Sequence, residues 1–184
     1  MIWNSRPLLN SCYNELMKVK LTNIKSIYLR SFIFGSEDSV VSTVGLLTGV
    51  ALSGVEGSII ILTGTILVFV EAFSMGVGMY LSESSVEEYE ARASVKVGAS
   101  IFSGIITFFS YCITGFVVML PYFFTNSYWA VTSSILISFV FLAILGLVSA
   151  KLSHISKIKK VLNMVIVGGL AILIGVVVGQ MITR

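Results

Sequence analysis

A carboxylate and two thioethers recur along one apolar stretch, residues 58–82. Glu71, Met75 and Met79 are spaced four residues apart, so they share one face of a helix with 3.6 residues per turn. A carboxylate is a hard oxygen ligand and a thioether is a soft sulfur ligand, and a face that combines them suits the path of a metal ion. The alternative is a protonated acid hydrogen-bonded across helices, with two methionines that only fill space.

A second group of carboxylates follows this stretch. Glu83, Glu87 and Glu90 lie at i, i+4 and i+7, which places them on one side of a helix that continues out of the membrane. Clustered carboxylates suit divalent cations, so we interpret this side as a loading site for metal ions. A solvated extension of the helix would explain the same pattern.

Another acid stands near the start of the preceding apolar stretch. Asp38, Ser42, Gly45 and Gly49 form a narrow face of small and polar residues. Small residues let helix backbones approach closely in lipid. We therefore expect this face to pack against residues 58–82 and to bring Asp38 near Glu71.

The composition places the chain among membrane proteins. Of 184 residues, 56% are hydrophobic and 11% are charged, and the mean hydropathy is +0.98. The net charge of +3 does not indicate nucleic-acid binding, because the basic residues form short clusters between apolar stretches. Cys12 and Cys112 lie in different regions and suggest neither a disulfide nor a thiolate metal site.

Apolar stretches of about 20 residues predict an all-α membrane protein. Its five transmembrane helices are expected at residues 32–53, 58–82, 98–120, 128–150 and 161–182. A tight turn at residues 54–57 would join the first two as a hairpin, and Pro121 would end the third.

Small and hydroxylated residues mark two further helix faces. Ala171, Gly175 and Gly179 predict close packing of the fifth span, either within the bundle or across a dimer interface. The third span carries hydroxyls at Ser103, Thr107, Ser110 and Thr114. We expect them to bond to carbonyls of their own helix, with contact to a substrate as the alternative.

The chain divides into a basic N-terminal segment, residues 1–30, and a transmembrane domain, residues 31–184. The first segment lacks the apolar core of a signal peptide, and its apolar periodicity predicts an amphipathic helix at the membrane surface, with a partly ordered tail as the alternative. With a cytosolic N-terminus, eleven of the 12 Lys and Arg residues fall on the cytosolic side, and only Arg184 falls outside. This asymmetry predicts a cytosolic N-terminus and an external C-terminus.

Two motifs resemble those of the vacuolar iron transporter family. They are FGSEDSVVSTVGLLTGV in the first span and VEAFSMGVGMYLSESS at the end of the second. In the family's pattern, Asp38 matches the acid of the first motif and Met75 the methionine of the second, while Glu71 and Met79 match the acid-and-methionine lining of its ion path. The chain departs from the pattern at Ser39, where the family usually has Gly, and at Met79, where many members have Glu or Gly. It is also compact, because about 15 residues replace the long Glu-rich cytosolic domain of eukaryotic members.

The resemblance implies a homodimer that exports Fe²⁺, and often Mn²⁺, from the cytosol in exchange for protons. The ion path would lie between the two copies of the first and second helices. The compact form favours a prokaryotic plasma membrane over a vacuolar membrane.

Combining residues and resemblance gives a transport hypothesis. Fe²⁺ approaches the acidic side at residues 83–90, passes between two subunits and binds Asp38, Glu71 and Met75, with Met79 lining the path. Iron or manganese is the substrate, and no resident cofactor is expected. A membrane scaffold without transport activity is the alternative, whereas an enzyme is not expected, because no nucleophile and base pair, phosphate loop or His-rich site is present.

Overall fold

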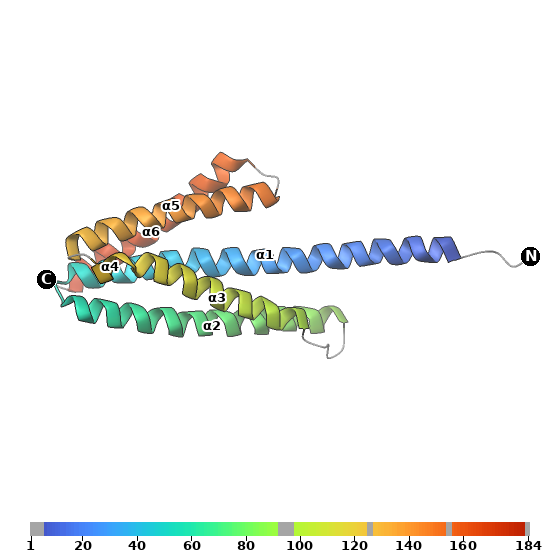
Figure 1. Ribbon diagram of the computed structural model, residues 1–184, viewed down its shortest axis with the longest axis horizontal. Coiled ribbons are helices and arrows are strands. Elements are labelled where there is room, and N and C mark those ends of the chain that lie inside the picture. Colours follow the sequence, from blue (N-terminus) through green and yellow to red (C-terminus); the bar gives the residue numbers. More distant parts are fainter. Residues whose placement is uncertain (1–5, 92–97, 125–126, 154–155, 183–184) are drawn as a thin grey trace, which may run out of the picture.

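The computed structural model describes residues 6–91, 98–124, 127–153 and 156–182, and every regular element in these ranges is an α-helix. The helices are α1 (Arg6–Leu52), α2 (Gly57–Ala91), α3 (Gly98–Met119), α4 (Pro121–Phe124), α5 (Ser127–Ser153) and α6 (Lys157–Ile182). The long helices lie side by side, with α2 and α3 on one side of α1 and α5 and α6 on the other (Figure 1). The predicted all-α class is confirmed.

Helix α1 is a single helix of 47 residues, about 70 Å long at 1.5 Å per residue. Its N-terminal part extends beyond the other helices (Figure 1). The predicted boundary between residues 1–30 and the first span therefore falls inside one continuous helix from Arg6 onward, and residues 1–5 lie outside the described residues. The orientation of this N-terminal part at the membrane surface stays a prediction, because the structure contains no membrane.

Four helical stretches among the described residues, not five, are long and apolar enough to cross a membrane. They are Gly57–Tyr89, Gly98–Phe124, Tyr128–Leu152 and Lys157–Met181. The other predicted span, residues 32–53, is the C-terminal half of α1, where Glu37, Asp38 and several hydroxyls lower the hydropathy. This half contacts α2, α3, α5 and α6, so much of its polar surface faces protein. A multi-pass membrane protein can accommodate such a helix because its neighbours shield it from lipid.

A turn joins α1 to α2 as the sequence predicts. The Gly54 amide donates to the carbonyl of Ala51 at 3.3 Å, and Gly54 has a φ of 76°. This left-handed conformation is readily adopted by glycine, which lacks a Cβ. The predicted hairpin of the first two spans is confirmed, and so is the end of the third span, because α3 stops at Met119, just before Pro121.

The glycine face of α1 packs against α6, not α2. A Cβ built on Gly179 would lie 2.6 Å from the carbonyl oxygen of Gly49, and one built on Gly49 would lie 2.8 Å from the carbonyl oxygen of Gly175. The prediction that this face packs against the second span is therefore wrong at Gly45 and Gly49. The small residues of α6 are used within the bundle, which decides between the two arrangements that the sequence left open.

Two apolar clusters hold α1 to its neighbours. One gathers Leu47, Ala51, Ile60, Met119, Tyr122 and Ala130 at the end where α1 turns into α2. The other gathers Val40, Val44, Val118, Leu142 and Ile172 between α1, α3, α5 and α6. Together they fix the central position of the C-terminal half of α1.

Candidate ion site between α1, α2 and α3

The two acids that the sequence predicts as neighbours lie within range of each other's charge. Asp38 of α1 and Glu71 of α2 lie close enough for their charges to interact, and both are half-buried. Two carboxylates that repel each other within a bundle are stabilised when a cation or a proton lies between them. This interaction agrees with the expected position of Asp38 near Glu71, although the glycines after Asp38 contact a different helix.

The packing of α2 on α3 sets the direction of Glu71. Val68 lies against Gly115, where an added Cβ would be 2.7 Å from a Val68 methyl carbon. One and two turns later, Ala72 is fully buried and Gly76 packs against Gly104. Glu71 precedes Ala72 by one residue, about 100° around the helix, and so lies at the edge of this contact.

The two methionines continue along the same edge of α2. Met75 and Met79 are half-buried, like Glu71. The sequence periodicity is thus retained in a continuous helix, with the carboxylate and both thioethers on one stripe. This stripe offers a mixed set of oxygen and sulfur ligands along α2.

Tyr111 of α3 is a polar side chain at this site that the sequence analysis did not select. It is fully buried, and its hydroxyl lies 2.6 Å from the hydroxyl of Ser42. Both Asp38 and Glu71 act on it electrostatically. The sequence could have indicated this residue, because a phenol hydroxyl in the middle of an apolar span needs a polar partner.

The acid next to Asp38 faces a different helix. Glu37 interacts electrostatically with Lys160, which lies in the first turn of α6. Adjacent residues on a helix point about 100° apart, so Glu37 and Asp38 are directed to different surroundings. Lys160 can compensate the charge of Glu37, whereas Asp38 faces Glu71.

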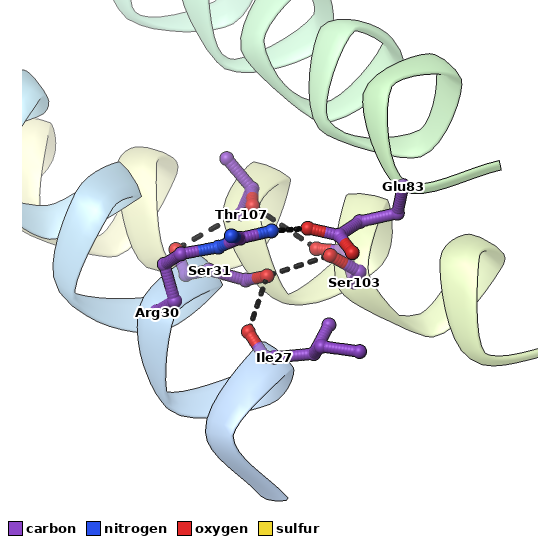
Figure 2. Close-up of polar contacts among 6 residues, drawn as sticks. All are labelled: Ile27, Arg30, Ser31, Glu83, Ser103 and Thr107. Carbon is purple, nitrogen blue, oxygen red and sulfur yellow. Dashed lines mark hydrogen bonds and ion pairs between the residues drawn. The ribbon is translucent and has the colours of Figure 1, made fainter. Parts of the chain in front are cut away.

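The acids on the predicted acidic side of α2 have different surroundings in the fold. Glu83 is buried, and its carboxylate forms an ion pair with Arg30 of α1 (Figure 2). Glu87 is half-buried and Glu88 is exposed, while the side chain of Glu90 lies outside the described residues. Glu83 is therefore already paired with the Arg30 guanidinium and is not part of an open carboxylate surface.

Hydroxyl groups bind α1 to α3 beside this ion pair. The hydroxyls of Ser31 and Ser103 lie 2.6 Å apart, and the Thr107 hydroxyl donates to the carbonyl of Ser103 at 3.0 Å (Figure 2). Ser110 likewise donates to the carbonyl of Thr107. The predicted bonds to the helix's own carbonyls are confirmed for Thr107 and Ser110, and Ser103 adds a bond between helices.

Among the side chains that the structure describes, no three from His, Cys, Asp and Glu come together as a metal cluster. Asp38 and Glu71 supply two carboxylates, and any further protein ligand must come from a thioether, a hydroxyl or another chain. Two acids with soft neighbours suit a transient site for a passing cation better than a closed structural site.

Comparison with known proteins identifies the family of the chain. The sequence model of the VIT family matches residues 29–101 and 90–180. The chain belongs to the VIT family. The match covers the C-terminal part of α1 and continues almost to the end of α6, and its two segments overlap around residues 92–97, which join α2 to α3. No curated protein matches the chain.

Membership indicates the general function of the chain. VIT-family proteins are membrane transporters of metal ions, so this chain is a metal-ion transporter of the multi-pass membrane class. The facing acids of α1 and α2 lie within the matched region.

Proposed function

We propose that this VIT-family protein moves Fe²⁺, and also Mn²⁺, out of the cytosol by exchange for protons. The observation that carries the proposal is the juxtaposition of Asp38 and Glu71 beside the thioether stripe. Two carboxylates can neutralise a divalent cation, and the thioethers of Met75 and Met79 disfavour the abundant hard ions Mg²⁺ and Ca²⁺.

Exchange follows from the repulsion between the two acids. When the metal ion leaves, two negative charges remain in surroundings of low dielectric, and a bound proton relieves their repulsion. Metal ions and protons thus bind the same carboxylates in alternation, which is the requirement for antiport.

A second copy of the chain would complete the path. Glu71, Met75 and Met79 are only half-buried within one chain, although they lie in a span that faces a membrane. A polar stripe of this kind is costly against lipid. A homodimer that places the two stripes face to face would remove that cost and double the number of ligands.

The acids at the end of α2 would collect the substrate. Glu87 and Glu90 lie within two turns of the buried Glu83, and carboxylates near an opening raise the local concentration of cations. Because Glu83 is paired with Arg30, we assign the first contact with metal to Glu87 and Glu90. Glu83 binds metal only after its ion pair with Arg30 breaks. The positive-inside distribution supports a cytosolic position for this end, and the compact form favours a prokaryotic plasma membrane.

The test is uptake of Fe²⁺ into proteoliposomes that contain a trapped iron-sensitive dye, with and without an imposed pH gradient. Flux that increases with the gradient and disappears in Asp38→Ala supports the proposal. Flux that ignores the gradient would replace the antiporter with a channel or uniporter. No flux of Fe²⁺ or Mn²⁺ through folded, dimeric protein would contradict the transport proposal and favour a membrane scaffold without transport activity.

A further inference from the structure

Tyr111 is held by α1 at two points. The Ser39 hydroxyl donates to the carbonyl of Tyr111 at 2.7 Å, and the Ser42 hydroxyl lies 2.6 Å from the phenol oxygen. The ring is fully buried. The position of the phenol hydroxyl relative to α1 is therefore set by packing and by two hydrogen bonds.

The pair of hydroxyls has one hydrogen to spare. Tyr111 and Ser42 each carry an O–H group, and only one of the two hydrogens is used in the bond between them. Within the described part of the chain, neither hydroxyl has another side-chain hydrogen bond. The charged groups that act on the phenol are Asp38 and Glu71, both of them hydrogen-bond acceptors when ionised.

Ser42 lies next to Asp38 on the helix surface. The two residues are four positions apart on α1, so they are neighbours on one face. A serine hydroxyl in this position is a hard oxygen donor, of the same class as the carboxylates. The phenol bond restricts the directions in which its lone pairs and hydrogen can point.

We propose that Tyr111 is a positioning residue of the ion site, which acts through Ser42. The Tyr111–Ser42 hydrogen bond holds the Ser42 hydroxyl one helical turn from Asp38. When a divalent ion is bound, the same pair turns the Ser42 oxygen toward the ion as an additional hard ligand. This inference rests on the proposed function, because it assigns residues to the same metal site.

The experiment measures Mn²⁺ and Cd²⁺ dissociation constants of the full-length protein in nanodiscs. The variants are Tyr111→Phe, Ser42→Ala and the double variant, with Tyr122→Phe as matched control. Tyr122 is also buried, but it belongs to the cluster where α1 turns into α2. The control thus removes the same atom from a second buried tyrosine away from the site.

Tyr111→Phe and Ser42→Ala are each expected to weaken Mn²⁺ binding about threefold to tenfold, as for the loss of one hydrogen bond. The double variant should bind Mn²⁺ no more weakly than the weaker-binding of the two single variants, because both changes break the same hydrogen-bonded pair. Binding of Cd²⁺, a soft ion, should change less than binding of Mn²⁺, because the lost ligand is a hard oxygen. A purely structural role would not change this preference.

Three results would overturn the inference. If Tyr111→Phe binds Mn²⁺ as tightly as the wild type, Tyr111 has no role in the site. Transport by the wild-type protein would then still support the proposed function. Equal losses for Mn²⁺ and Cd²⁺ in Tyr111→Phe and in Tyr122→Phe would show a structural effect only. Wild-type protein that binds neither ion would contradict the proposed function itself.

Discussion

At the scale of single residues, Asp38 of α1 and Glu71 of α2 carry the proposed ion site. Asp38 and Glu71 interact through their charges and are half-buried. In the proposed mechanism, the binding of a metal ion or proton by one acid therefore affects binding by the other. Replacing one acid by its amide keeps the shape and removes one charge. The two roles of a carboxylate, metal ligand and proton carrier, can thus be tested together.

Glu71→Gln is expected to abolish the part of Fe²⁺ flux that depends on a pH gradient, because the amide cannot exchange a proton. The measurement is dye-detected flux into proteoliposomes at several imposed gradients. Glu88→Gln is the matched control, since Glu88 is an exposed acid on the same helix. Undiminished gradient-dependent flux in Glu71→Gln would exclude Glu71 from the mechanism.

Met75→Leu is expected to reduce the preference for Fe²⁺ over Ca²⁺ by roughly tenfold, or about 1.4 kcal/mol, because a thioether disfavours hard ions and leucine has a similar volume. Competition of Ca²⁺ with Fe²⁺ flux measures this preference. Met181→Leu is the control, because Met181 is exposed near the end of α6. An unchanged preference in Met75→Leu would reduce Met75 to a packing residue.

At the scale of helices, polar contacts join α1, α2 and α3 at the end near Glu83. The buried carboxylate of Glu83 is paired with Arg30, whose side chain is 62% exposed, next to the hydroxyl contact of Ser31 with Ser103 (Figure 2). A buried charge that loses its partner is destabilising. The exposed position of Arg30 lowers this cost, because water can reach the site.

Arg30→Ala is therefore expected to destabilise the protein by about 1–3 kcal/mol, measured as a lower thermal midpoint of the purified protein. Adding Glu83→Gln should recover part of the loss, because it removes the unpaired charge. Lys25→Ala is the control, since Lys25 is an exposed cation on the same helix. If Arg30→Ala is as stable as this control, the ion pair contributes nothing to stability.

The contact of α1 with α6 depends on the absence of side chains. A Cβ on Gly179 would lie 2.6 Å from the carbonyl oxygen of Gly49, whereas a Cβ on Gly169 would first meet Phe139 at 3.6 Å. Gly179→Ala is expected to destabilise the protein by about 1–3 kcal/mol, because backbone must shift. Gly169→Ala on the same helix should be neutral or stabilising by up to about 1 kcal/mol, because alanine favours helix. Thermal midpoints that do not separate the two variants would argue against this contact.

At the scale of the whole molecule, the glycine contacts place the C-terminal end of α6 beside the end of α1. Gly179 meets Gly49, and the N-terminal part of α1 extends from the opposite end of the bundle (Figure 1). If the C-terminal half of α1 crosses the membrane with the four apolar helices, the two ends of the chain lie on opposite sides. If it does not cross, they lie on the same side.

Single cysteines introduced at Ser5 and Thr183 of a chain without Cys12 and Cys112 test this arrangement. An impermeant thiol reagent added to intact cells is expected to label Thr183→Cys and not Ser5→Cys. Ser5→Cys should become reactive after the membrane is opened, which controls for its reactivity. Labelling at both positions in intact cells, or accessibility of Lys157 from outside, would overturn the predicted topology.

Much of this protein was predictable from its sequence, because the relevant signals are local. Hydropathy indicated the membrane class, and the first-span and second-span motifs indicated the family that the comparison confirms. The 3.6-residue period placed Glu71, Met75 and Met79 on one stripe, which the continuous helix α2 retains. The period of a helix depends only on its own backbone, so these faces can be read without a partner.

Only the tertiary structure decided which faces meet. Small-residue faces on different helices are equivalent partners in lipid, so the pattern at Gly45 and Gly49 did not distinguish α2 from α6. The sequence likewise did not distinguish between charge partners that are distant along the chain. In the fold, Arg30 forms an ion pair with Glu83, and Lys160 interacts electrostatically with Glu37. Tyr111 lies within range of the charges of Asp38 and Glu71 because α3 packs against both α1 and α2. Sequence thus determined which groups each helix carries, whereas the packing of the helices determined which groups act together.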